Sequence, residues 1–254
     1  MIFALLFSEE KFCLSRNFRL QKVGDIHWLN KNYNLPYISQ YLDELMILDV
    51  ERTDDRSSGV REAFLESLRA LNQKLFLPIC AGGKIQSVED ANLLFKNGAE
   101  KVVLNSGLYG HPEVVEEIVG KFGAQAVIAS VDYRVCDSGI KIYSNNGQKK
   151  EECSVEELFE KLSELNCGEI IFNSIDQDGT GFGPNFDFLE LKPQSFDLPV
   201  IISGGFGKPH HFEEALSRGD VEAVSTSNIL NFIGDSFKNA RNILMENKIS
   251  LGKW

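Results

Sequence analysis

Cysteine and histidine are scarce in this chain, and their arrangement excludes several kinds of site. The five cysteines and four histidines among the 254 residues are scattered, with no Cys-x-x-Cys pair and no zinc-ligand spacing. A Ser-His-Asp or Cys-His catalytic set is also missing. We therefore expect reduced thiols rather than disulfides, as in a cytoplasmic protein, and neither a metal nor a cofactor.

Long hydrophobic runs and an excess of basic residues are absent as well. The apolar stretch 1–7 is too short for a signal peptide or a membrane helix, and Glu9 and Glu10 follow it directly. The net charge of −11 disfavours nonspecific binding to nucleic acid, which requires basic patches. A phosphorylated small-molecule substrate stays compatible with this charge, because backbone amides and helix ends can hold a phosphate. We expect no nucleic acid and no membrane among the partners.

Short apolar runs alternate with amphipathic helical patterns along the chain. Continuous apolar runs are typical of parallel strands that are buried on both faces. Eight such runs favour a closed (β/α)8 barrel over an open sheet, in a single domain that spans 1–254. The expected strands are 2–7, 44–48, 76–81, 101–104, 126–131, 169–172, 200–203 and 223–226. The expected helices are 60–72, 88–97, 113–122, 155–165 and 211–218.

The same signals occur twice, about half the chain apart. Leu77-Pro78 followed by Gly82-Gly83 returns as Leu198-Pro199 followed by Gly204-Gly205. Such self-similarity indicates an internal repeat. The barrel is therefore expected to consist of two related halves of four βα units each.

Two glycine pairs follow expected strands, where a barrel has its active site. They lie in Gly82-Gly83-Lys84 and in Ser203-Gly204-Gly205. Glycine lets backbone N–H groups approach a phosphate closely, whereas the alternative for either pair alone is a tight turn. Two pairs in register with the repeat favour two phosphate sites on opposite sides of one mouth. Small polar residues at neighbouring strand ends complete the predicted phosphate-binding set, namely Asn105, Ser106, Thr226 and Ser227.

Acidic residues follow three other expected strands. Asp132 comes after 126–131 and is a candidate general acid or base, with a hydrogen-bonding carboxylate or a helix cap as the alternative. Asp178, Gly179 and Thr180 come after 169–172. They either contact the substrate and its second phosphate or form an Asx-turn. Asp49, after 44–48, either is structural or orients the substrate.

A second charged set stands where strands begin, at the opposite face of the barrel. It consists of Glu44, Lys101, Glu169 and Glu222. These charges either form a ring of salt bridges over a central passage or are solvated strand ends.

Together these motifs resemble the cyclase (synthase) subunit of imidazole glycerol phosphate synthase, the HisF family, over nearly the whole chain. The most specific stretches are 123–132, 174–180 and 199–205. The resemblance implies a TIM barrel that takes ammonia from a glutaminase (HisH-like) subunit at its N-terminal face and uses it in a lyase-cyclase reaction on a two-phosphate substrate. It implies a catalytic role for Asp132, a gate made of Glu44, Lys101 and Glu169, and substrate binding by the polar strand-end residues.

Three positions depart from that family pattern. The family's strand-one motif is Cys-Leu-Asp, whereas the strand here reads Ala4-Leu5-Leu6-Phe7-Ser8. Leu5 or Leu6 therefore stands where a catalytic aspartate is expected, and Glu9 or Glu10 follows only in the loop. The gate arginine has no counterpart, and Lys84 replaces a glycine.

The strand-one leucine resembles paralogs found with bacterial surface-polysaccharide genes, in which the barrel and its glutaminase supply ammonia to a sugar amidotransferase. Two functions therefore stay open. One is the lyase-cyclase, and the other is an ammonia conduit without cyclase activity. A sugar-phosphate isomerase without a glutaminase is a third, which the gate residues disfavour.

Overall fold

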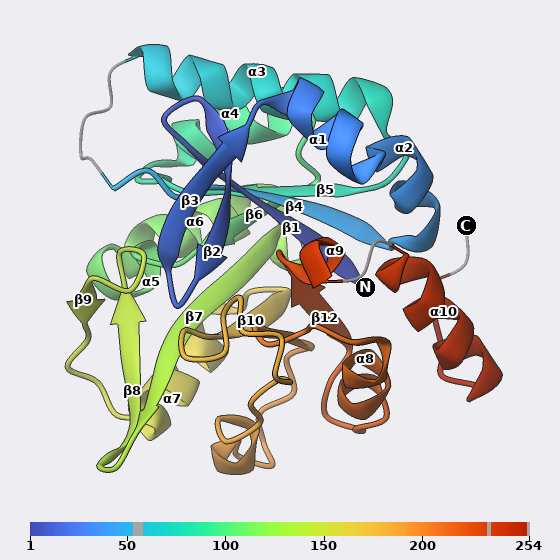
Figure 1. Cartoon of the computed structure of the whole chain (residues 1–254). Coiled ribbons are helices and arrows are strands. Elements are labelled where there is room, and N and C mark those ends of the chain that lie inside the picture. The colour runs from blue at the N-terminus through green and yellow to red at the C-terminus, as the bar shows by residue number, and fades with distance from the viewer. Residues whose placement is uncertain (53–57, 233–234, 253–254) are drawn as a thin grey trace.

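Eight parallel strands close into a barrel in the computed structural model, which describes residues 1–52, 58–232 and 235–252, with the backbone alone at 58–61. The strands follow one another around the barrel in chain order, β12 pairs with β1, and β7 pairs with β10. Helices surround them (Figure 1). The (β/α)8 barrel expected from the sequence is therefore confirmed. The barrel strands are β1 (Ile2–Ser8), β4 (Glu44–Asp49), β5 (Ile79–Gly82), β6 (Lys101–Leu104), β7 (Val127–Cys136), β10 (Glu169–Ser174), β11 (Val200–Ser203) and β12 (Ala223–Thr226).

Local capping signals begin several of the helices. The Asp25 carboxylate accepts the Trp28 N–H at 3.0 Å at the start of α1, and Ser87 caps α4 in the same way. Ser154 and Glu157 form a complete capping box at the start of α7. The helices are α1 (Ile26–Tyr33), α2 (Leu35–Ile38), α3 (Ser58–Lys74), α4 (Val88–Lys96), α5 (Gly107–Gly110), α6 (Pro112–Phe122), α7 (Val155–Leu165), α8 (Pro209–Leu216), α9 (Ile229–Phe232) and α10 (Ser236–Glu246). Within the described ranges, every helix is too short or too polar to cross a membrane.

The two halves of the barrel share features that the expected strands did not include. In the first half β1 continues into the antiparallel hairpin β2 (Lys11–Arg16) and β3 (Arg19–Gly24). In the second half β7 continues into β8 (Gly139–Ser144) and β9 (Lys149–Lys150). A four-residue helix follows the last strand of each half, α5 after β6 and α9 after β12. Both hairpins lie toward the C-terminal ends of the barrel strands, away from the N-terminus (Figure 1).

Among the starts of the expected strands, that of β5 is furthest from the prediction. The strand predicted at 76–81 begins only at Ile79, and Phe76 is fully exposed, at 101%. Pro78 explains the late start, because it has no N–H for the ladder and contributes only its carbonyl, which accepts the Leu45 N–H at 3.0 Å.

The connection between β10 and β11 contains a 3-10 turn, Leu189–Leu191, instead of an α-helix. Aromatic side chains cover the barrel there. Phe188 stacks on Phe172 of β10 with ring centroids 4.3 Å apart, and Phe159 of α7 packs against both Phe188 and Phe196. This cluster gives the sixth unit an apolar cover of the kind that a helix gives the others.

The strands separate two apolar layers, because alternate side chains point to opposite faces of a strand. In β1 the side chains of Phe3 and Leu5 belong to the outer layer between barrel and helices, whereas Ile2 and Ala4 belong to the inner layer. The other buried members of the inner layer are Met46, Cys80, Val103, Ile128, Ile171 and Ile201. The barrel interior is therefore a packed apolar plug between the two ends of the strands.

Candidate active site

The C-terminal ends of the strands surround a cavity of about 440 Å³, a volume common for small-molecule sites. The structure brings most of the predicted site residues together in its wall. Those that line it are Gly83, Lys84, Asn105, Ser106, Asp132, Asp178, Gly179, Ser203, Gly204, Gly205, Thr226 and Ser227. Two predicted residues lie outside the wall. Gly82 belongs to β5 beside the Val103 carbonyl, and the Thr180 hydroxyl donates to the Gln177 carbonyl at 2.9 Å.

The glycine pairs are required by the packing of the mouth itself. Gly205 has φ +90°, and a Cβ there would lie 1.9 Å from the Gly183 carbonyl oxygen. Gly83 has φ +100°, and a Cβ there would lie 2.1 Å from the Asp49 carbonyl oxygen. The short helices α5 and α9 follow the strands beside these loops, an arrangement that barrels use to hold phosphate. Gly83 and Gly205 thus form tight turns and also line the cavity in which phosphate binding was predicted.

We expect Gly205→Ala to lower the free energy of unfolding by roughly 2–4 kcal/mol, because it adds a backbone collision to left-handed strain. Gly139→Ala is the matched control, since Gly139 has φ +97° and a Cβ there would meet no atom within 4 Å. The control should lose only about 1 kcal/mol. Urea denaturation measures both. Equal losses would mean that the Gly183 backbone moves away without cost.

The β2–β3 hairpin is fastened to the loop after β10 by Asp178. Its carboxylate accepts the Phe18 N–H at 3.0 Å and the Ser15 hydroxyl, while its backbone carbonyl accepts the Asn17 N–H at 2.9 Å. A Cβ on Gly179 would lie 2.1 Å from the Ser15 carbonyl oxygen, so glycine is needed where the hairpin crosses. Burial raises the pKa of Asp178, and its hydrogen bonds partly offset this. The sequence did not suggest this structural role.

Asp132 is a buried carboxyl group held between two amides. Asn173 Nδ2 donates to one carboxylate oxygen at 3.0 Å, and Asn105 Nδ2 donates to the other at 3.3 Å. Burial raises the pKa of Asp132 to about 7; Asn173 acts against this rise, and the charge of Asp178 adds to it. A carboxyl group with a pKa near neutrality can give or take a proton efficiently. Asn173, which the sequence did not single out, faces Asp132 because β7 and β10 pair at these residues.

The cavity wall at β1 is apolar at the position where the family resemblance implies a catalytic aspartate. Leu6 lines the cavity, whereas Leu5 is 4% exposed and packs in the outer layer. Glu9 and Glu10 form the exposed turn of the β1–β2 hairpin and do not line the cavity, and Glu9 pairs with Lys22. Of the two leucines left open by the sequence, Leu6 is therefore the one at the site.

A further buried carboxylate in the wall was missed from the sequence. Glu51, two residues beyond the end of β4, is 8% exposed and lines the cavity. Its carboxylate accepts the Ser8 hydroxyl at 3.0 Å, the Glu9 N–H at 2.7 Å and the Arg52 N–H at 3.2 Å. The available signal was the Asp49-Val50-Glu51 run, in which two acids follow one strand.

At the opposite face, three of the four predicted strand-start charges form one cluster. Lys101 Nζ lies 3.2 Å from a Glu44 carboxylate oxygen and 2.7 Å from one of Glu169. Burial acts to lower the pKa of Lys101, but the hydrogen bond to Glu169 and the two carboxylate charges outweigh it and raise the pKa. Burial raises the pKa of Glu44. Glu222 lines the same hollow and accepts the Val200 N–H at 3.1 Å.

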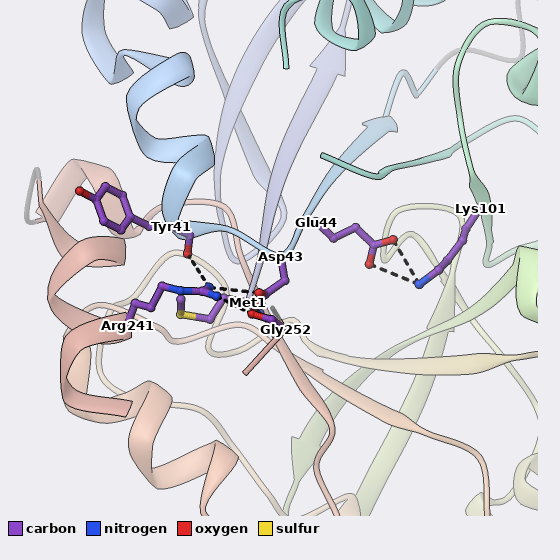
Figure 2. A network of polar contacts seen from close by, with 7 residues as sticks. All are labelled: Met1, Tyr41, Asp43, Glu44, Lys101, Arg241 and Gly252. Carbon is purple, nitrogen blue, oxygen red and sulfur yellow. Dashed lines mark hydrogen bonds and ion pairs between the residues drawn. The ribbon is translucent and has the colours of Figure 1, made fainter. Parts of the chain in front are cut away.

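A second polar network lies beside this cluster (Figure 2). Arg241 of α10 donates to Asp43 at 3.0 Å, to the Gly252 carbonyl at 2.8 Å and to the Tyr41 carbonyl at 3.4 Å. The amino group of Met1 lies 2.5 Å from the other Asp43 oxygen. Arg241 thus ties the segment after α10 to the residues that precede β4.

Comparison with known proteins agrees with this geometry. The family described as histidine biosynthesis protein matches residues 22–232. A Parasynechococcus marenigrum protein with the provisional name imidazole glycerol phosphate synthase subunit hisF2 is 39% identical over all of this chain and 93% of its own length. The subunits named HisF from Corynebacterium urealyticum and Chlorobaculum tepidum are 36% and 33% identical, over 90% and 85% of this chain and 88% and 84% of theirs.

Among the described residues, no three His, Cys, Asp or Glu side chains gather as a metal site would require. The barrel, the strand-end residues in one cavity and the extent of these matches lead to the same conclusion: the chain belongs to the histidine biosynthesis protein family, among the HisF subunits of imidazole glycerol phosphate synthase.

Proposed function

We propose that this chain is the synthase subunit of a glutamine amidotransferase complex and performs an imidazole glycerol phosphate synthase-type lyase-cyclase reaction with ammonia. The observation that carries the proposal is Asp132, a carboxyl group with a pKa of about 7, held by two amides in the wall of a strand-end cavity. The names of the HisF relatives support the same reaction.

The cavity has the parts that a two-phosphate substrate needs. Gly83, Lys84 and Ser106 line one side, and Gly205 and Ser227 line the other. Backbone amides, hydroxyls and one ammonium group are the donors that proteins use for phosphate. A substrate whose two phosphates are held at these two sides crosses the mouth. The Asp132 carboxyl group is then close to the middle of that substrate.

A glutaminase docked at the N-terminal face is the proposed source of ammonia. The Lys101 cluster lies at that face, at the entrance to the apolar interior of the barrel. Phe76, fully exposed in the connection between α3 and β5 at the same end, provides an apolar anchor of the kind found at protein interfaces.

The test is turnover of the two-phosphate substrate of imidazole glycerol phosphate synthase by the purified chain, without a glutaminase. Excess ammonium chloride at mildly alkaline pH supplies free ammonia. Formation of imidazole glycerol phosphate supports the lyase-cyclase. Binding of the substrate without turnover contradicts it.

The alternative function is an ammonia conduit to a sugar amidotransferase, without cyclase activity. Leu6 favours it, because a leucine at the mouth cannot transfer a proton. Substrate binding without turnover, together with activation of a glutaminase by the chain, is the combination that distinguishes this function from the lyase-cyclase.

We expect Lys101→Met to reduce glutamine-driven turnover roughly tenfold while ammonium-driven turnover stays near that of the wild type. Removal of the central cation leaves Glu44 and Glu169 repelling each other, and an effect on the order of 1–2 kcal/mol corresponds to about that factor. Paired assays with glutamine and with ammonium chloride make the comparison. Lys96→Met, at an exposed position on α4, is the control. Equal loss in both assays would contradict a role in ammonia transfer.

A further inference from the structure

Glu51 and Asp132 bring carboxyl groups to opposite sides of the same cavity. Asp132 belongs to β7, which is four strands away from β1 in either direction around the barrel. Glu51 follows β4 and is hydrogen-bonded to Ser8, the last residue of β1. Both side chains line the cavity, from strands that are three positions apart around the barrel.

The Glu51 carboxylate is held firmly at the end of β1. Ser8 is two residues beyond Leu6 and therefore shares its face of the strand, about 7 Å further along. Three donors fix the carboxylate, namely the Ser8 hydroxyl and the N–H groups of Glu9 and Arg52. A carboxylate with this many donors keeps one position in the wall above Leu6.

The surroundings of Glu51 favour its ionised form. Burial acts to raise the pKa of Glu51, but the hydrogen bonds from Ser8, Glu9 and Arg52 and the charge of Lys84 outweigh it, and the pKa is lowered. The other charged and titratable groups at this corner lie on several elements. They are Asp49 of β4, which accepts the Glu51 N–H at 3.2 Å, the Arg52 guanidinium, Lys22 of β3, Cys13 of β2 and the Glu9 carboxylate. The pKa values of Glu51 and Asp132 are thus displaced in opposite directions, as in acid–base pairs of known enzymes.

Glu151 does not offer the same arrangement. It also lines the cavity, but it lies next to the β8–β9 hairpin that extends β7, on the side of Asp132. Lys149 pairs with its carboxylate at 3.0 Å, and the Ser144 hydroxyl donates to the other oxygen. Glu151 therefore lies on the same wall as Asp132, and its carboxylate is occupied by Lys149 and Ser144.

We propose that Glu51 is the second catalytic residue of this site, the general base that works opposite the acid Asp132. The proposal rests on the proposed lyase-cyclase function. When ammonia adds to a substrate carbonyl, the C–N bond forms and the C–O π bond breaks. Glu51 accepts one proton from the new ammonium nitrogen, and Asp132 gives its proton to the carbonyl oxygen. Proton exchange with solvent at the mouth then restores both groups.

The experiment measures ammonium-driven turnover of the two-phosphate substrate by wild type, Glu51→Gln and Glu9→Gln, with rates expressed per concentration of free ammonia. Glu51→Gln keeps the shape of the side chain and removes its charge. We expect its kcat to fall by roughly 10²–10⁴-fold, with KM within about twofold and with the acidic limb of the kcat–pH profile lost. Glu9→Gln, in the same turn but outside the cavity, should match the wild type.

Thermal unfolding separates a catalytic role from a structural one. A fall in melting temperature together with a rise in KM, with the acidic limb retained, would show that Glu51 only supports the loop and would overturn the proposal. Glu51→Asp keeps the charge, and we expect an intermediate kcat with the acidic limb of the kcat–pH profile intact. This variant tests the proposal even if Glu51→Gln folds poorly. Full activity of Glu51→Gln overturns the role of Glu51 and leaves the lyase-cyclase standing. No turnover by the wild type overturns both.

Discussion

Asp132→Asn is expected to lower ammonium-driven turnover by roughly 10²–10⁴-fold while the two-phosphate substrate still binds. The amide keeps the size of the side chain but cannot deliver a proton to the substrate. Steady-state turnover and equilibrium binding of the substrate measure the two effects separately. Asp137→Asn, at an exposed position in the β7–β8 turn, is the matched control.

The same substitution should also make the protein more stable above neutral pH. The pKa of Asp132 is about 7 in the folded chain against an ordinary value of 3.8, so the folded state holds the extra proton between these two values. Stability therefore falls as the pH rises from about 4 to 7, by up to a few kcal/mol, and stays low above that. The neutral amide of the variant carries no such penalty, and its melting temperature should exceed that of the wild type at pH 8 but not at pH 4. A variant that is less stable at both pH values would contradict a net cost of ionising the buried Asp132 carboxyl group.

Leu5→Asp is expected to unfold the protein, whereas its neighbour Leu6→Asp should fold. Leu5 packs in the outer layer at 4% exposure, so the variant loses leucine packing worth roughly 2–5 kcal/mol and also buries a carboxyl group without a partner. Leu6 faces the cavity, where a carboxylate can be hydrated. Circular dichroism and urea denaturation of the two variants measure the contrast.

Activity of Leu6→Asp gives this comparison a second readout. With Glu51 as base, the new carboxylate should change ammonium-driven turnover by no more than a few fold. A gain of about 100-fold or more would mean that the wild-type mouth lacks a working base, in conflict with the role inferred for Glu51. Comparable stability of the two variants would in turn show that the side chains of β1 do not alternate between cavity and core as described.

The barrel strands were predictable because each is a short apolar run, and a strand buried on both faces leaves that signal in the sequence. The errors in the expected strands have local causes. Phe76 looks like part of such a run, but Pro78 delays the ladder. The β2–β3 and β8–β9 hairpins contain mixed polar and apolar residues. Because they have no apolar run, their strands form by pairing with a neighbouring strand, which the local sequence does not reveal.

Most of the cavity wall, but not all of it, was predictable for a related reason. Residues that directly follow the apolar runs of the sequence, such as Asp132 and the glycine pairs, can be found by position alone. Glu51 lies two residues further on, and its burial depends on Ser8 from another strand, a contact that no local pattern encodes. The choice between Leu5 and Leu6 likewise needed the register of β1 against β4, because a shift of one residue exchanges the two faces of a strand.

The apolar plug inside the barrel has a consequence for the balance of protons in the proposed reaction. Moving an ion into such an interior is far more costly than moving a small neutral molecule, so ammonia can cross the layer around Cys80 and Ile171 only without its extra proton. In the proposed reaction, the molecule that reaches the mouth is thus a base without an accompanying proton. In that reaction, the protons used at the mouth therefore come from groups at the mouth, such as Asp132, and from the solvent that restores them.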